Sequence, residues 1–142
     1  PRFLITRRSP NKKKFPGVWT VPGGKLEVSD YLNLPKDTDN AWYNVFEKVI
    51  TREVKEEVGI EINNLEYVID LVADYGDYHG LVISLMADYV SGDVKLLPEE
   101  ADQYAWVTLE EAKNYDLIDG IYDELVMTDN KLKGIKTEWK RF

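Results

Sequence analysis

The pattern of apolar and polar positions predicts a series of short strands. Residues 2–6 (RFLIT) are apolar and β-branched, and residues 18–21 (VWTV) precede a Pro-Gly-Gly turn. Two longer apolar segments, 65–75 and 81–90, flank the turn sequence GDYHG, which is typical of a β-hairpin. Residues 104–108 (YAWVT) are expected to form a last short strand, and residues 25–28 (KLEV) a further one.

A helical pattern occupies residues 40–58. Thr38 or Asp39 is a suitable N-cap for this helix, because both side chains accept hydrogen bonds from the first free N–H groups. Gly59 follows the last residue of the pattern and is expected to end the helix.

The second half of the chain contains further helical signals. Thr108 and Glu111 form a capping box at the start of TLEEA, and another helix is expected near 119–128. Pro, Gly and turn-forming residues mark 7–17 and 29–38 as loops. Because helices and strands alternate without a strict βαβ order, we expect an α/β (α+β) fold in which a mixed sheet packs against helices.

Composition places the chain among single-domain globular proteins. It has 142 residues, 44% of them hydrophobic, no cysteine, and one histidine, His79, in the expected hairpin. No apolar run spans a membrane and no signal peptide is visible, so we expect one domain over residues 1–142 in the cytoplasm. A strand in progress at Pro1 suggests that upstream residues are missing. The lack of cysteine excludes disulfides, thiolate metal sites and a cysteine nucleophile.

Charge is distributed unevenly along the chain. Residues 1–26 contain seven basic residues and no acidic one, whereas the remainder contains 11 basic and 26 acidic residues. The net charge of −8 argues against a general nucleic-acid surface. An acidic body with a basic edge suits an anion and a divalent cation bound side by side, although a solvated loop is the simpler explanation for Lys12–Lys14 alone.

The segment REVKEEVGI, residues 52–60, concentrates glutamates in the last turns of the long helix. On a wheel of about 100° per residue, Glu57 and Glu56 fall about 40° and 60° from Glu53, on opposite sides. The apolar residues within roughly 60° of Glu53 are Trp42, Phe46, Val49 and Ile50. The glutamates therefore continue the stripe that is apolar in the preceding turns, and they do not extend the solvent-facing side.

Three carboxylates on such a stripe are prohibitively costly unless a positive charge meets them. The residues alone leave two explanations open. One is a hard divalent cation such as Mg²⁺ or Mn²⁺, which prefers dense oxygen ligands. The other is an ion-paired helix end that reaches into a cleft, with Arg52 paired to Glu56 four residues further on. The spacing of an EF-hand calcium loop is absent.

Two segments together resemble the signature of the Nudix hydrolase family. PGGKLE at 22–27 precedes the helix, and REVKEEVGI matches the second half of the Nudix box, R-E-U-x-E-E-x-G-U, where U is bulky and apolar. The matching residues are Arg52, Glu53, Val54, Glu56, Glu57, Gly59 and Ile60. The segments FLITRRS, FPGVWTVPGGKLE and YAWVTLEEA are also similar to MutT-like members, so the resemblance covers most of the chain. It implies an α/β/α sandwich with a mixed β-sheet.

The chain departs from the family pattern in two ways. Between Gly24 and Arg52 lie 27 residues, 14 more than the pattern has, which places an insertion at about residues 29–40. The first glutamate of the box is also replaced. Counting forward from Gly24 gives Asp30, and counting back from Arg52 gives Asn44. The insertion is expected beside the cleft, where it either shapes the substrate pocket or serves a partner.

The resemblance implies a divalent-metal site with Mg²⁺ or Mn²⁺ as cofactor. The implied ligands are Glu53, Glu56 and Glu57, with the backbone carbonyl of Gly23 or Gly24 as a further one. Glycine suits that position because it lets a backbone oxygen approach a metal or a phosphate closely.

The implied reaction is hydrolysis of a nucleoside diphosphate linked to another moiety. Mg²⁺ offsets the charge of the pyrophosphate and helps to make a hydroxide, and water attacks phosphorus. Glu53 is the first candidate for the general base, with Glu99 or Glu100 as the second, and Arg52 is placed to orient Glu56.

Basic and aromatic residues supply candidates for substrate binding. The phosphate-binding candidates are Arg7, Arg8, Lys25 and Gly24. Because neighbouring strand residues point to opposite faces, only one of the two arginines reaches the cleft, and we favour Arg8. The aromatic residues available to stack on a base are Trp19, Tyr75, Tyr78, Tyr104 and Trp106, although each is more simply explained as core or surface.

The resemblance leaves several functions open. A nucleoside triphosphate, oxidised or not, cleaved to monophosphate and pyrophosphate is the first choice, and ADP-ribose or a sugar nucleotide is the alternative. A catalytically silent Nudix domain that binds a nucleotide to regulate a partner is favoured by the altered first half of the box, but the intact REVKEE argues against it. We expect a small-molecule nucleotide as partner, no nucleic acid or membrane, and a monomer or homodimer.

Overall fold

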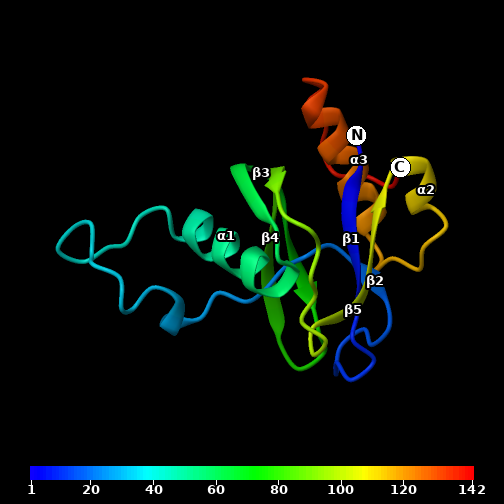
Figure 1. The fold of residues 1–142 in the computed structure, drawn as a ribbon. Coiled ribbons are helices and arrows are strands. Elements are labelled where there is room, and N and C mark those ends of the chain that lie inside the picture. The colour runs from blue at the N-terminus through cyan, green and yellow to red at the C-terminus, as the bar shows by residue number, and fades with distance from the viewer.

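In the computed structural model, which describes residues 1–142, strands in two antiparallel sheets lie between helices (Figure 1). The strands are β1 (Phe3–Arg8), β2 (Trp19–Thr20), β3 (Glu61–Asp74), β4 (His79–Ser91) and β5 (Ala101–Val107). The helices are α1 (Val45–Val58), α2 (Leu109–Ala112) and α3 (Ile121–Leu132), with a 3-10 helix, η1, at Val28–Asp30. No helix has both the length and the apolar character needed to cross a membrane.

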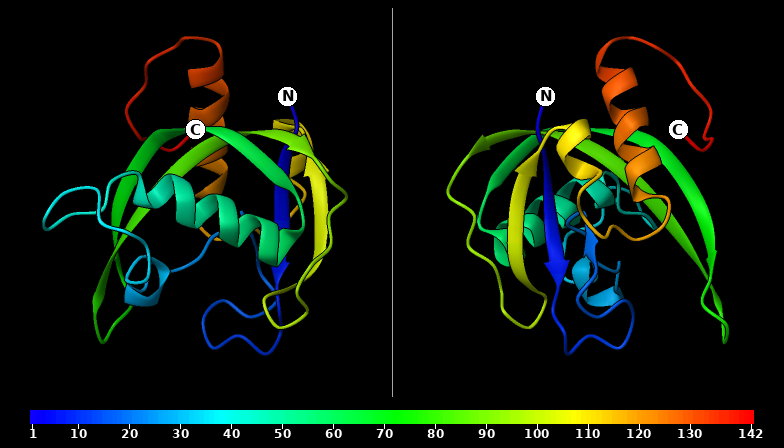
Figure 2. Two further views of the ribbon diagram at one scale, coloured as in Figure 1. Left: turned by 60° about the vertical axis from the view of Figure 1, so that its left-hand side comes forward. Right: turned by 90° about the vertical axis from the view of Figure 1, so that its right-hand side faces the viewer.

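The strands pair in two groups. β2, β1 and β5 form one sheet in that order, and β3 pairs with β4 in a long hairpin. The parallel part of the predicted mixed sheet is limited to an isolated bridge between Trp19 and Leu117. Figure 2 shows α1 on one side of the strands and α3 on the other, in agreement with the predicted α/β/α arrangement.

Alternation along β1 directs neighbouring side chains into two separate cores. The core beside α2 and α3 contains Ile5, Val107, Ala112 and Leu125. The core beside the end of α1 contains Val54, Val58 and Ile60, with Leu4 and Trp106 packed against it. Because alternate strand residues share a face, Arg8 lies on the α1 side with Leu4, and Arg7 lies on the opposite side.

Helix α1 begins later than the sequence predicts, and neither predicted N-cap is used. Asn44 takes a left-handed conformation with φ of 56°, and the helix starts at the next residue. The segment before it is held as a loop by its own side chains. The Trp42 indole N–H donates to the Leu34 carbonyl at 2.9 Å, and the Asp37 carboxylate accepts from the Tyr43 N–H at 2.8 Å. The prediction that the helix begins near residue 40 is therefore wrong. The side-chain contacts provide hydrogen-bond partners for backbone groups of residues 34–43, which do not form a helix.

The end of α1 is as predicted. Gly59 has φ of 84°, a left-handed conformation that favours glycine, and its N–H contacts the Val54 and Lys55 carbonyls at 3.1 Å. A Cβ at Gly59 would also lie 3.1 Å from the Lys95 backbone nitrogen. Glycine thus allows the β4–β5 connection to pass close to the glutamate-bearing end of the helix.

Other elements agree with the sequence except near residues 25–28. No strand forms there, because the Asp30 carboxylate accepts the Glu27 N–H at 2.7 Å and the chain turns into η1. The hairpin around GDYHG is confirmed, and its strands are longer than expected. Thr108 caps α2 by accepting the Glu111 N–H at 3.2 Å, but the Glu111 carboxylate accepts from Arg2, so only the Thr108 half of the predicted capping box forms.

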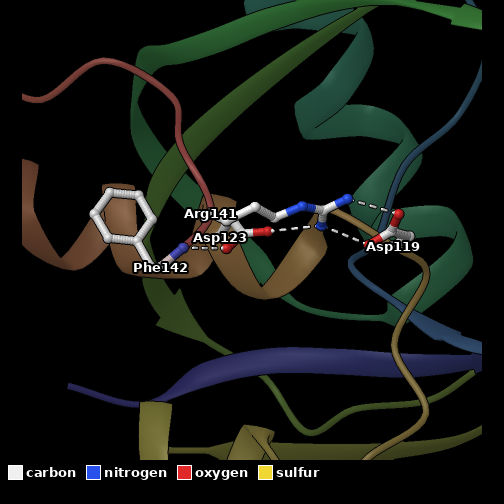
Figure 3. Close-up of polar contacts among 4 residues, drawn as sticks. All are labelled: Asp119, Asp123, Arg141 and Phe142. Atoms are coloured by element: carbon white, nitrogen blue, oxygen red, sulfur yellow. Dashed lines mark hydrogen bonds and ion pairs between the residues drawn. The ribbon is translucent and has the colours of Figure 1, made fainter.

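The C-terminal residues return to the start of α3 (Figure 3). Arg141 donates to Asp119 at 2.6 and 2.9 Å and to Asp123 at 3.2 Å, and the Phe142 N–H donates to Asp123 at 2.8 Å. Asp123 is buried, so these donors supply the partners that a buried carboxylate requires. The contacts tie the last residues to α3, on the side of the strands opposite α1 (Figure 2).

Candidate metal and phosphate site

A carboxylate without a partner lies where the Pro-Gly-Gly turn meets α1. Glu53 Oε2 is buried and has no hydrogen-bond partner. A Cβ on Gly24 would lie 2.1 Å from that oxygen, so glycine is what leaves room for the carboxylate. A Cβ on Gly23 would meet nothing within 4 Å. An unpaired buried oxygen is costly in itself and is also a suitable ligand for a hard cation.

Glu57 lies one turn further along α1 and is half-buried. Burial raises the pKa of its carboxyl to about 7, and the negative charges of Glu100 and Glu53 add to the rise. Burial also raises the pKa of Glu53, with Asp30 contributing. Both carboxyls therefore hold a proton more readily than an ordinary glutamate does, and a nearby cation would oppose that shift.

The connection between β4 and β5 is fixed against the end of α1. The Lys95 N–H donates to the Val58 carbonyl at 2.8 Å, and the Leu97 N–H donates to the Glu57 carbonyl at 3.1 Å. This connection brings Glu100, the second candidate base, close enough to Glu57 to raise its pKa. The Glu100 carboxylate pairs with Lys12 at 2.5 Å. Lys12 is thus not a solvated loop lysine, and it carries the N-terminal basic loop to the edge of the site.

Arg52 joins the inserted segment to the helix. Its guanidinium donates to the Asp30 carboxylate, and its Nε lies 3.7 Å from a Glu56 oxygen. Counting forward from Gly24, Asp30 takes the place of the first glutamate of the Nudix box. Its carboxylate still pairs with Arg52, the arginine of the box. Sequence reasoning named Asp30 only as a departure, and the count from Gly24 was the signal that identifies its role.

The buried side of α1 is centred differently from the prediction. Val49, Val54 and Val58 are the buried residues of the helix. Phe46, expected in the buried stripe, is 43% exposed because it lies beyond the core, and Trp42 precedes the helix.

This arrangement separates the three predicted glutamate ligands. Glu53 and Glu57 lie on the arc that contains the buried valines, whereas Glu56 lies outside it with a side chain 61% exposed. No three acidic or histidine side chains stand close enough together to hold a metal ion. The ligand set of Glu53, Glu56 and Glu57 therefore stays a prediction, and Glu56 joins it only by turning away from Arg52.

The predicted phosphate-binding residues differ in their availability. Arg7 lies on the far face of β1, where it forms two hydrogen bonds with Asp102, one of them 2.8 Å from Nε to Oδ1. Arg8 lies on the α1 side, as favoured, and its Nε donates to the Lys14 carbonyl at 2.9 Å. Lys25 is exposed and directly follows Gly24. Arg7 is thus occupied by Asp102, whereas the phosphate-binding roles of Arg8 and Lys25 stay predictions.

Comparison with known proteins decides the family. The NUDIX domain family matches residues 1–126. The chain belongs to the Nudix family. The resemblance inferred from the Nudix box is confirmed, and the α+β fold is that of this family.

Similar proteins include two curated Nudix relatives and a solved structure. The chain is 29% identical over 107 residues to the NAD-capped RNA hydrolase NudC of Pseudomonas aeruginosa, covering 75% of this chain and 32% of that protein. It is 30% identical over 125 residues to the nucleoside triphosphatase NudI of Klebsiella pneumoniae, covering 81% and 79%. The crystal structure of a MutT protein from Methanosarcina mazei has a TM-score of 0.68 at 27% identity, covering 93% and 86%. The Nudix chain thus spans about a third of NudC and most of NudI.

Proposed function

We propose that this Nudix domain hydrolyses a nucleoside diphosphate linked to a further moiety. The favoured substrate is a nucleoside triphosphate, oxidised forms included, which is cleaved to the monophosphate and pyrophosphate. The observation that carries the proposal is the unpartnered, buried Oε2 of Glu53 beside the Glu57 carboxyl, an arrangement that a divalent cation would stabilise. The family and the named activities of NudI and NudC support a pyrophosphohydrolase.

The donors of the site fit a hard divalent cation, Mg²⁺ or Mn²⁺. Glu53 and Glu57 would hold it, with Glu56 and a carbonyl of Gly23 or Gly24 as further oxygen ligands. The fit rests on the orphaned oxygen of Glu53 and on the space beside it that a Cβ at Gly24 would fill. When bound, such a cation supplies Lewis-acid chemistry, offsetting charge on the pyrophosphate and lowering the pKa of water.

The chain's own residues supply proton transfer and orientation. The water oxygen forms a bond to phosphorus while the bond from phosphorus to the bridging oxygen breaks, and pyrophosphate leaves with that oxygen. Glu53 is the first candidate to accept the proton of the water, because its two oxygens allow one to face a cation and the other the water. Glu100 is the second candidate. Arg52 acts through Glu56, which it orients.

Arg8 and Lys25 are the proposed phosphate contacts. Arg8 uses one of its five N–H donors on the Lys14 carbonyl, so four remain for phosphate oxygens. Lys25 follows the glycine beside Glu53 and is exposed, so we expect its flexible side chain to turn toward a phosphate bound there. Arg7, paired with Asp102 on the other face, is expected to contribute nothing to substrate binding.

Turnover of a nucleotide panel with Mg²⁺ tests the proposed function. The panel contains common and oxidised nucleoside triphosphates, ADP-ribose, dinucleoside polyphosphates and sugar nucleotides. Glu53→Gln and Glu57→Gln should each lower kcat by roughly 100-fold or more. Glu47→Gln, which alters an exposed glutamate in the first turn of α1, should have no effect. Turnover that survives EDTA, or that survives in both site variants, would refute the proposal.

A nucleotide-binding domain without catalysis is the second candidate. The observation in its favour is that Glu56 stands apart from Glu53 and Glu57, paired with Arg52. It predicts that members of the same panel bind and none is turned over. Preferential turnover of ADP-ribose or a sugar nucleotide would instead retain the hydrolase and change its substrate.

A further inference from the structure

A cluster of one lysine and two tyrosines joins the N-terminal basic loop to the tip of the β3–β4 hairpin. The Lys14 ammonium lies 3.8 Å from the centre of the Tyr75 ring and 4.1 Å from that of Tyr78. It also donates a hydrogen bond to the Tyr78 hydroxyl. The two ring centres are 5.3 Å apart, with the ring planes at 48°. Side chains from distant parts of the sequence therefore meet in one cation–aromatic group.

The hairpin is built to hold these rings. A Cβ on Gly80 would lie 2.8 Å from the Tyr75 ring, so glycine at that position lets the ring approach β4. The Tyr75 N–H donates to the Tyr78 carbonyl at 3.0 Å, and Gly76 within the turn has φ of 90°. Tyr78 remains 47% exposed, so its ring is accessible to a ligand.

The loop that carries Lys14 also reaches the candidate site, because the Lys14 carbonyl accepts from Arg8 Nε at 2.9 Å and the Lys12 ammonium pairs with Glu100 at 2.5 Å. The hydrogen bond from Lys14 holds the pKa of the Tyr78 hydroxyl below its usual value, and the charge of Lys25 adds to this effect while Asp77 opposes it. Lys25 directly follows Gly24, the glycine that leaves room for the Glu53 carboxylate. Neither Lys14 nor Lys25 forms an ion pair, although the chain carries 26 acidic residues.

We propose that Lys14, Lys25, Tyr75 and Tyr78 form the subsite for the nucleotide end of the substrate. The base stacks on the tyrosine rings, since every base offers an aromatic face, and a phosphate binds the two ammonium groups. Lys14 has three N–H donors and gives one to Tyr78, so donors remain for a phosphate oxygen. The inference rests on the proposed function and narrows it, because a pyrophosphate without an aromatic base would leave both rings unused.

The other aromatic residues offer a poorer site for a nucleotide. Trp19 packs edge-on against Tyr115 with ring centres 4.7 Å apart, within the core beside α3. A pocket of about 290 Å³ contains three aromatic residues, but its charged residue is acidic and it has no basic one. Its lining residues are Tyr89, Gly92, Asp93, Val94, Tyr104 and Trp106. A phosphate in that pocket would meet the Asp93 carboxylate and no basic group, whereas at the hairpin tip the Lys14 ammonium offsets the nearby Asp77.

An amide NMR titration of the ¹⁵N-labelled chain tests the subsite, with adenosine 5′-monophosphate and adenosine as separate probes in EDTA. Chelation ensures that no divalent cation recruits the phosphate to α1. The expected shifts centre on residues 75–80, and the monophosphate should bind roughly fivefold more tightly than adenosine. Lys14→Gln should reduce that preference, because only Lys25 then remains for the phosphate, and Tyr78→Ala should weaken the binding of both probes. The control is Lys140→Gln, which alters a lysine 5.1 Å from the Phe142 ring and should change neither affinity.

Four results would overturn the subsite. They are the absence of shifts at millimolar monophosphate, shifts centred on Tyr89 and Trp106, equal affinity for both probes, and unchanged affinity in a Lys14→Gln protein whose spectrum shows it to be folded. Failure of the proposed function is scored separately by turnover. Turnover without binding at residues 75–80 would support the hydrolase and reject the subsite. Binding at residues 75–80 without turnover would support the subsite and reject the hydrolase.

Discussion

Gly24 and Glu53 approach each other so closely that a methyl group at position 24 would lie 2.1 Å from Glu53 Oε2. The two residues belong to the two parts of the Nudix box, which are separated in the sequence by the segment predicted to be an insertion. The contact shows that this segment leaves the glycine turn and the glutamate helix joined. The inserted residues are accommodated as a loop and the short η1 helix before α1, and Figure 1 shows them extending away from the strands.

Gly24→Ala should therefore impair the site far more than Gly23→Ala. The new methyl group at position 24 forces the Glu53 carboxylate to move, and a misplaced ligand lowers both Mg²⁺ affinity and kcat, the latter by roughly tenfold or more. At position 23 a Cβ meets nothing within 4 Å, so a much smaller effect is expected. Steady-state kinetics at several Mg²⁺ concentrations make the comparison. Similar losses in the two variants would show that the Gly24–Glu53 contact is unimportant.

The metal-free protein should lose stability as the pH rises through about 7. Burial raises the pKa of Glu57 from 4.5 to about 7, so the folded state favours the protonated form. The corresponding stabilisation is complete below pH 4.5, the unfolded value, and is lost as the pH rises through the folded value. Allowing for solvent around this half-buried group, the loss is about 1 kcal/mol.

Thermal unfolding in EDTA at pH 5.5 and pH 8.5 measures this loss. The difference in Tm between the two conditions should be smaller for Glu57→Gln, which cannot ionise. Mg²⁺ at pH 8.5 should raise the Tm of the natural chain and have less effect on the variant. An identical pH dependence of Tm in the two proteins would show that the ionisation of Glu57 does not cause the loss of stability.

Glu100 and its neighbour Glu99 should differ in their effect on catalysis. Glu100 is close enough to Glu57 to raise its pKa and pairs with Lys12, whereas Glu99 is exposed. Glu100→Gln should lower kcat by roughly tenfold or more if this carboxylate takes part in proton transfer. Glu99→Gln should stay within about twofold of the natural chain. A pH–rate profile that loses one limb in Glu100→Gln would identify it as the base in place of Glu53.

Arg52 is predicted to connect catalysis with the order of the inserted segment. Arg52→Ala removes the donor to Asp30 and the charge beside Glu56, so kcat should fall and cleavage by proteases within residues 28–43 should become faster. Lys55→Gln is the matched control, because it alters another basic residue of α1 and breaks only an exposed pair with Glu61 at the start of β3 (3.1 Å). Limited proteolysis read by mass spectrometry separates the two. Equal cleavage rates in all three proteins would show that Asp30 is held without Arg52.

Local patterns in the sequence predict the elements of the site well. The hairpin over residues 76–80, the glycine stop at Gly59 and the Thr108 cap depend on neighbouring residues, and all three are found. The glutamates could be singled out because helical spacing places charge on a side that is apolar in the preceding turns. The helical wheel alone does not show which of the three glutamates is buried. That depends on where the core ends, and the core follows Val54 and Val58 rather than Phe46.

The features that sequence reasoning missed are contacts between distant residues. Asn44 in a left-handed conformation delays the start of α1, and the contact of Trp42 with the Leu34 carbonyl replaces a helical turn. The pairing of Asp30 with Arg52 and the position of Lys14 over two tyrosines join segments that no periodicity relates. Such contacts are determined by the packed fold, and of these residues only Asp30 could be located by a residue count, the one from Gly24.

Binding of Mn²⁺ measured by electron paramagnetic resonance tests most directly whether the end of α1 is a metal site. The natural chain should bind Mn²⁺ at micromolar to sub-millimolar free concentrations, and Mg²⁺ should compete. Glu53→Gln and Glu57→Gln should each weaken that binding by roughly tenfold or more, and Glu47→Gln should leave it unchanged. If the natural chain binds no Mn²⁺, or if all three variants bind it equally well, the glutamates are only a charged helix end and the account is wrong.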